Sequence, residues 1–342
     1  MTAMCAVLSF SFSLTNCEVE DEITTTAENK SSSVSNTPDL ISFTIQGAQN
    51  QTEVITMLKF ASWEHFDSTA NQLSEELEIY DDAFLAANES LGEEELDEFK
   101  FTSGYNDQVP QINFENSLEF TNPLRIPFNA MNEAYMEGNL EGTSPYASFA
   151  WSGSELSLIN NRQRVAIGNE IFQTMDDGYV SFTQDHVENL SLLAQNNLDA
   201  LKDKEGVTVN VSKALDCRFW KASKYQDEIS SDRRVDLVAK IRSVPLYSKQ
   251  EKMPISYKHR RGRMRERRTH MSVNIVSTLY STSCGSDPVN RSKAHNTYKK
   301  KRRRDIKTTV WGGGLVYAPN LTGIKGEHRH YTAPHPTYSL PW

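Results

Sequence analysis

Arginines at alternate positions are the most chemically distinctive feature of this sequence. In the stretch RGRMRERR they are Arg261, Arg263, Arg265 and Arg267. On a β-strand alternate side chains share one face, so four guanidinium groups would line that face at intervals of roughly 6.6 Å. Such a row repels itself, and we expect it to lie on solvent or opposite an anion rather than in the core. The row therefore predicts an anion-binding face.

A second basic run follows, made of Lys299, Lys300, Lys301, Arg302, Arg303 and Arg304. In a nuclear protein both runs would indicate nucleic-acid binding through phosphates, without reading of sequence. No zinc finger or RNA-recognition motif accompanies them, so nucleic acid is the less favoured partner. The alternatives are an anionic glycan or other envelope component, the acidic half of the same chain, or solvated strand edges on which Lys and Arg prevent aggregation.

No stretch indicates a catalytic site, and we expect a non-enzymatic protein without a cofactor. Residues 151–156 (WSGSEL) and 283–287 (SCGSD) lack the G-x-S-x-G nucleophile elbow, and no phosphate-binding loop or dinucleotide fingerprint is present. His328 and His330 would share a strand face, but no third ligand is fixed nearby, so no metal site is predicted. A glycan-directed hydrolase is the third alternative, although the many acids of the N-terminal half make any carboxylate pair uninformative.

The first residues predict export. Residues 5–15 form an apolar, Ser/Phe-rich run about as long as a signal-peptide core, and LTNC then ends at Cys17, followed by EVEDE. This junction resembles the lipobox and acidic export tag of surface lipoproteins of the Bacteroidota. The resemblance implies that residues 1–16 are removed, that Cys17 is acylated, and that the protein is anchored at the cell outer membrane. The alternative is a buried N-terminal strand with a chance cysteine.

A second stretch also resembles a known sequence pattern. The segment LINNRQRVAIGNEIF contains Leu158, then Asn160 or Asn161, then Ile-Gly-Asn-Glu-Ile at 167–171. It resembles a segment of uncharacterised secreted proteins of the Bacteroidota. The resemblance bears on the compartment and implies no activity.

Cysteine usage agrees with export. Once Cys5 is removed and Cys17 is acylated, Cys217 and Cys284 remain. A pair in an oxidising compartment is a disulfide candidate, and two buried free thiols are the alternative.

The net charge of −9 conceals two oppositely charged halves. Residues 1–200 hold 33 acidic and 6 basic residues, a net of −27, whereas residues 201–342 hold 12 acidic and 30 basic residues, a net of +18. This asymmetry indicates two domains or surfaces with different partners, or two halves that attract each other.

Hydrophobic periodicity predicts an α+β fold, with a helix-rich N-terminal region before a β-rich module. Residues 40–206 form the acidic α+β region, and residues 207–335 form a basic, sandwich-like β module with a tail over 336–342. Residues 17–39 are poor in large apolar residues and predict a tether between the lipid anchor and the folded body.

Individual elements follow from the same patterns. Helical spacing predicts helices within 62–101, with a break at 88–92, and another helix over 183–206 that Thr183 caps. Prolines predict an irregular stretch over 107–129. The pair Asp177-Gly178 predicts a hairpin turn.

Overall fold

The computed structural model describes residues 37–46, 52–175, 178–194, 198–211, 220–244, 247–280, 292–303, 307–313, 328–330 and 338–340. The sequence candidates Cys17, Cys217, Cys284 and Arg304 lie outside these ranges. Helices and strands both contribute substantially to the described chain, which confirms the mixed α+β class.

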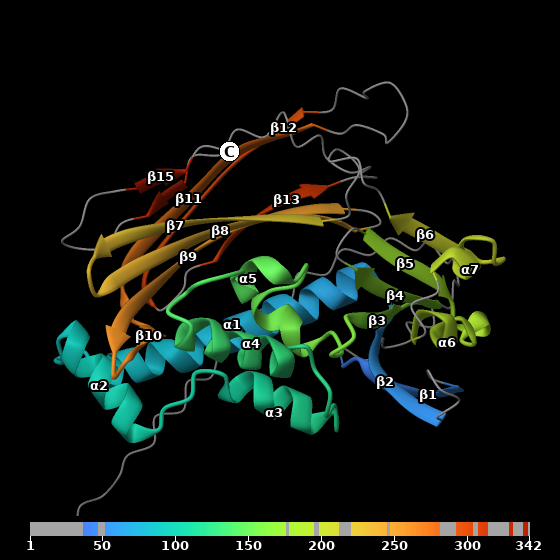
Figure 1. The fold of residues 1–342 in the computed structure, drawn as a ribbon, viewed down its shortest axis with the longest axis horizontal. Helices are drawn as coiled ribbons and strands as arrows, with labels where there is room; N and C mark the ends of the chain where they lie inside the picture. Colours follow the sequence, from blue (N-terminus) through green and yellow to red (C-terminus); the bar gives the residue numbers. More distant parts are fainter. Residues whose placement is uncertain are drawn as a thin grey trace, which may run out of the picture. The chain divides into compact units, whose positions relative to one another are not determined.

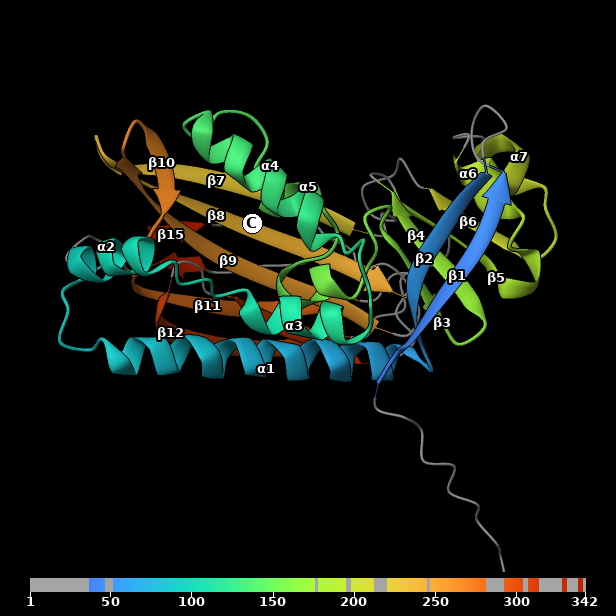
Figure 2. The same cartoon turned by 90° about the horizontal axis from the view of Figure 1, so that it is seen from below.

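Six strands form the first sheet, and one crossover carries most of the helices. The strands, in spatial order, are β1 (Asp39–Gln46), β2 (Thr52–Phe60), β3 (Arg164–Ile167), β4 (Glu170–Met175), β5 (Gly178–Thr183) and β6 (Val207–Val211). All neighbours are antiparallel except β2 and β3, which are parallel. A parallel pair needs a long connection, and helices α1 to α5 lie within it (Figure 2).

The first two helices begin and end where the sequence predicts. The helix α1 (Trp63–Ala87) begins after Ser62, whose Oγ accepts a hydrogen bond from the His65 backbone N–H. The helix α2 (Glu93–Ser103) follows the predicted break, and the Glu95 side chain accepts the Gly92 N–H at 2.9 Å. The acidic helices are therefore confirmed.

The stretch predicted to be irregular, 107–129, is largely helical, so that prediction is wrong. It contains α3 (Val109–Ser117) and the start of α4 (Arg125–Glu137). Pro110 and Pro127 lie in the first turns of these helices, where backbone N–H groups have no intrahelical acceptor and proline is tolerated. The short helix α5 (Pro145–Ser148) and the 3-10 helix η2 (Gly153–Ser157) complete the crossover.

The hairpin prediction is confirmed, whereas the prediction of one long helix over 183–206 is wrong. Strands β4 and β5 pair antiparallel with Met175 opposite Gly178. The segment predicted as one helix over 183–206 contains η3 (Gln184–His186), α6 (Asn189–Ala194) and α7 (Leu198–Lys202). Thr183 ends β5 and makes no side-chain cap hydrogen bond. The apolar stripe of this segment nevertheless packs into the core against the first sheet.

The basic module is β-rich, as predicted. Its strands are β7 (Trp220–Ser230), β8 (Arg233–Val244), β9 (Tyr247–Arg260), β10 (Arg263–Glu266), β11 (Thr269–Tyr280), β12 (Ser292–Arg303), β13 (Thr308–Gly313), β14 (His328–His330) and β15 (Tyr338–Leu340). Strands β10 and β13 pair with opposite ends of the same edge of β9, and β11 pairs with β12. The sandwich-like packing stays a prediction. Strand β6 belongs to the first sheet, which extends beyond residue 206.

Apolar contacts pack helices on both faces of the first sheet and against strands of the second sheet. Alternate residues of β2 point to opposite faces, so Leu58 and Phe60 pack against α1 and η2 while Ile55 and Met57 pack against α6 and α7. A separate core joins Tyr135 and its neighbours on α4 to β8, β9 and β10 (Figure 1). No helix in the described ranges is both long enough and apolar enough to cross a membrane.

Candidate anion-binding site

The basic strands lie against the acidic helices, so the two charged halves attract each other. Ion pairs join Lys301 to Glu78 on α1 at 2.9 Å and Arg267 to Glu93 on α2 at 2.9 Å. Lys258 of β9 pairs with the same end of α2. In Figure 2, α1 runs along the β11–β12 hairpin. Most described basic side chains therefore have a carboxylate partner within the chain.

The arginine row is folded into a hairpin, so the prediction of one continuous strand is wrong. Strand β9 ends at Arg260, and β10 begins at Arg263. The two residues between them, Arg261 and Gly262, have φ of 52° and 85°. Positive φ at both positions is what a type I′ hairpin turn needs, and glycine satisfies it without strain. Arg263 and Arg265 share the β10 strand, whereas Arg261 lies in the turn.

Three of the four predicted arginines contact carboxylates. Arg263 pairs with Glu133 at 3.1 Å and also with Glu137, both on α4. Arg267 is 3% exposed and pairs with Glu93. Arg261 is 56% exposed and lies 3.7 Å from a Glu98 carboxylate oxygen.

Arg265 differs from the other three. Among the described residues, no hydrogen bond or ion pair holds its guanidinium group. Its guanidinium carbon lies 5.3 Å from the centroid of the Phe101 ring, and Arg261 lies over the same ring at 4.4 Å. Burial, followed by the nearby charge of Arg263, lowers the pKa of Arg265. The surroundings therefore leave its positive charge poorly compensated.

A cavity of about 510 Å³ lies beside this guanidinium, between α2, α4 and the β9–β10 hairpin. Five cationic side chains line it: Lys100, Lys258, Arg260, Arg265 and Arg267. All except Arg265 pair with carboxylates of the acidic helices or of the segment that follows them. Glu133 also lines the cavity and acts on the charge of Arg265, but its ion pair is with Arg263.

The rest of the cavity wall includes the ring of Phe101 and four acidic residues, Glu94, Asp97, Glu133 and Glu266. Phe101 is 48% exposed, and the guanidinium groups of Arg261 and Arg265 lie over its ring. The Asp97 carboxyl accepts the backbone N–H of Arg268 at 3.2 Å, and burial raises its pKa. The cavity wall thus combines the unpaired guanidinium of Arg265, the ring of Phe101 and the Asp97 carboxyl group, whose pKa is raised. This combination fits an anionic ligand that also carries a ring.

The lysine-rich run lies elsewhere. Lys299 and Lys301 both pair with Glu78, and each is 31% exposed. Lys300, Arg302 and Arg303 lie in β12. Lys299 lines a second cavity, of about 300 Å³, and the described side chains of Lys299 and Lys301 do not line the arginine cavity.

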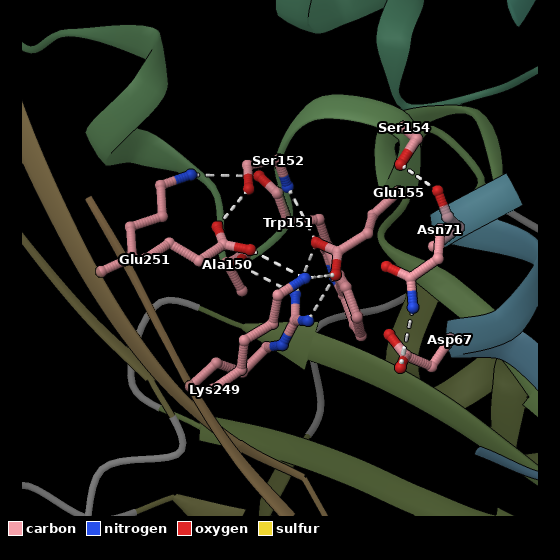
Figure 3. A network of polar contacts seen from close by, with 12 residues as sticks. Asp67, Asn71, Ala150, Trp151, Ser152, Ser154, Glu155, Lys249 and Glu251 are labelled. Carbon is pink, nitrogen blue, oxygen red and sulfur yellow. Dashed lines mark hydrogen bonds and ion pairs between the residues drawn. The ribbon is translucent and has the colours of Figure 1, made fainter. Parts of the chain in front are cut away.

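Sequence reasoning did not single out a buried charged cluster around Glu155 (Figure 3). Glu155 is 1% exposed, accepts hydrogen bonds from Arg242 at 2.6 and 2.9 Å, and lies 2.5 Å from the Lys249 Nζ. Burial acts to raise the pKa of the Glu155 carboxyl, but the charges of Arg242 and Lys249 outweigh it and hold the pKa well below its usual range. Lys249 and Glu251 alternate within the β-rich module, and this spacing of charged residues was the available signal.

The described residues contain no candidate metal site. No group of three or more His, Cys, Asp or Glu side chains there could hold an ion. His328 and His330 lie in the short strand β14.

Comparisons with known proteins add little. No protein-family model matches the chain, and no curated protein matches it. Among solved structures it is similar to a DUF4848 family protein from Bacteroides thetaiotaomicron. That likeness has 12% sequence identity and a TM-score of 0.19, and it covers 83% of this chain and 97% of the other. A TM-score this low carries no argument about fold or function.

Proposed function

We propose that this protein is a non-catalytic binding protein whose arginine cavity, the cavity of about 510 Å³ beside Arg265, takes an anionic ligand. The observation that carries the proposal is the unpaired guanidinium of Arg265 on the cavity wall. A buried or half-buried cation without a counter-ion is costly, and a ligand anion would supply the missing charge.

The ligand class follows from the other wall residues. A guanidinium group binds carboxylate, sulfate or phosphate through directed N–H donors. The exposed Phe101 ring provides a flat apolar surface for a sugar or other ring. We therefore favour a short segment of an anionic glycan over an extended polyanion. An extended polyanion would need the whole basic surface, and there it would compete with carboxylates such as Glu78 and Glu133.

The proposed place of action is the cell surface. The lipobox-like LTNC and the acidic residues after it support acylation at Cys17 and a tethered body at the outer membrane. Cys17→Ser should then move the protein from the membrane fraction to the soluble fraction. Intact-mass analysis of the membrane-extracted protein tests the same point, since an unmodified Met1 would contradict the anchor.

The binding proposal is tested by titrating the protein with an oligogalacturonate in low-salt buffer. Arg265→Ala should weaken binding at least tenfold, and Arg265→Lys should restore part of it. Arg162→Ala is the control, because it also removes one positive charge and lies in the turn before β3, where Arg162 pairs with Glu53. Equal affinity of wild type and Arg265→Ala, or no binding of anionic oligosaccharides by the wild type, contradicts the proposal.

A further inference from the structure

The second cavity, of about 300 Å³, lies between α1, α3, η2 and the basic strands. Lys249 and Lys307 form part of its wall on the strand side. Asn71, Ser74 and Gln111 supply hydroxyl and amide groups on the helix side. The helix side also carries the carboxylates of Glu78, Asp81 and Asp107, which are paired with Lys301, Arg268 and Lys100 respectively.

Four basic side chains, two of which belong to the basic wall, lie close together. Lys240 and Arg242 of β8 lie opposite Glu251 and Lys249 of β9 in the strand register. Lys307 precedes β13 and lies 2.9 Å from the Glu251 carboxylate. Cross-strand neighbours on one face are close enough for their charges to interact strongly.

The carboxylates of Glu155 and Glu251 each contact more than one basic side chain. Lys249 contacts Glu155 at 2.5 Å and Glu251 at 2.8 Å, and Glu251 also accepts a hydrogen bond from Ser152. Figure 3 shows these side chains pointing toward one another. Asp67 of α1 adds a third carboxyl group, whose pKa burial raises.

Lys307 is the cation that a ligand could reach. Its side chain is 24% exposed, and its one ion pair among the described residues is with Glu251. An ammonium group has three N–H donors, so a single carboxylate oxygen does not satisfy it. Burial lowers the pKa of Lys307, in agreement with incomplete compensation of its charge.

Gly153 opens the space beside this ammonium group. Its φ is 59°, and a Cβ at this position would lie 3.6 Å from the Lys307 Nζ. Glycine therefore brings the backbone close to Lys307 with no side chain between them.

We propose that this second cavity binds the phosphate or carboxylate group of a small hydroxylated molecule between Lys249 and Lys307. The hydroxyl groups of the molecule would face Asn71, Ser74 and Gln111. This site is separate from the arginine cavity, so its occupancy does not depend on the proposed glycan function. The volume of about 300 Å³ admits a ligand of the size of one sugar phosphate or sugar acid.

Calorimetric titration tests the proposal with two probes in separate arms, inorganic phosphate and glucuronate. At least one should show a saturable site in Arg265→Ala, the variant in which the arginine cavity lacks its unpaired cation, and the arms distinguish phosphate from carboxylate recognition. Lys307→Gln should weaken that binding at least tenfold. Lys202→Gln is the control, since Lys202 also pairs with one carboxylate, Asp199, and lies on α7 away from this cavity.

A second measurement on the wild type does not depend on the stability of a variant. Reductive methylation followed by mass spectrometry reports the accessibility of each lysine. The bound probe should protect Lys307 and leave Lys202 reactive, because Lys202 also pairs with one carboxylate and lines neither cavity. Saturation by neither probe, unchanged affinity in Lys307→Gln, or equal protection of the two lysines overturns the proposal.

Discussion

The guanidinium of Arg268 donates to the Asp81 carboxylate, with Nη1 at 2.9 Å from Oδ2, although the two residues are 187 positions apart. Both are buried, with side-chain exposures of 1% and 6%. The Tyr105 hydroxyl donates to the same carboxylate at 3.2 Å, and burial raises the pKa of this tyrosine. This contact joins the C-terminal part of α1 to the segment between β10 and β11, so it links the acidic half of the chain to the basic half.

Asp81→Asn should lower the free energy of unfolding by about 3–5 kcal/mol, because it leaves the buried Arg268 charge without its main partner. Asp82→Asn is the matched control at the next position. The Asp82 side chain is 53% exposed and lies 3.5 Å from Lys301, so its loss should cost less than about 1 kcal/mol. Urea unfolding of both variants gives the comparison, and equal losses would contradict the role assigned to Arg268 and Asp81.

A second prediction concerns acid stability. Burial acts to raise the pKa of Glu251, but Lys249 and Lys307 outweigh it and hold the pKa below its ordinary 4.5. A carboxyl group with a depressed folded-state pKa stabilises the fold fully above its unfolded value, and this contribution is lost as pH falls through the folded value. Stability should therefore fall below pH 4.5.

Glu251→Gln should reduce that acid dependence, because the residue no longer titrates. Glu205→Gln, at an exposed position, controls for loss of one carboxylate. Denaturant unfolding from pH 6 to pH 3 compares the slopes, and identical slopes in the wild type and Glu251→Gln would refute the assignment.

The sequence predicted α1 and α2 well because their start and stop signals are local. Ser62 and Gly92 cap the two helices through neighbours three residues away. The helices α3 and α4 were missed because prolines were read as breakers, although Pro110 and Pro127 occupy first turns. Composition alone does not place a proline relative to a helix start.

The candidate site was predictable in part. The sequence showed the excess of arginine around residue 265 and therefore indicated anion binding. It also contained Arg261-Gly262, a possible hairpin turn, which was not recognised as one. Which arginine is unpaired was not predictable, since the partner carboxylates of Arg263 and Arg267 lie 126 to 174 positions away. The Glu155 cluster depends on the same long-range packing.

A third prediction compares two glycines with similar backbone and different surroundings. Gly206 has φ of 70°, and a Cβ there would lie 3.0 Å from His186 Cδ2, whereas Gly104 has φ of 68° and open space around it. Gly104→Ala should cost about 1–2 kcal/mol from backbone strain alone. Gly206→Ala should cost more, because the His186 ring must also move. A smaller loss at Gly206 than at Gly104 in thermal unfolding would show that this packing is loose.

The last prediction concerns Lys240, whose side chain is 2% exposed and donates to the Trp151 carbonyl at 3.1 Å. Burial lowers its pKa from the ordinary 10.5 to about 7, and Glu251 and Glu155 compensate only in part. Between these two pH values the unfolded state binds the proton that the folded state has released, so stability should rise with pH.

Lys240→Met removes this titration. From pH 7.5 to pH 9 the wild type should gain roughly 2 kcal/mol relative to the variant, since one pKa unit corresponds to about 1.4 kcal/mol. Lys204→Met, at an exposed position, controls for loss of a positive charge and should keep the pH dependence of the wild type. Urea unfolding at the two pH values measures the difference. A constant gap between wild type and Lys240→Met would mean that Lys240 keeps its proton throughout this range, and that the cluster compensates its charge fully.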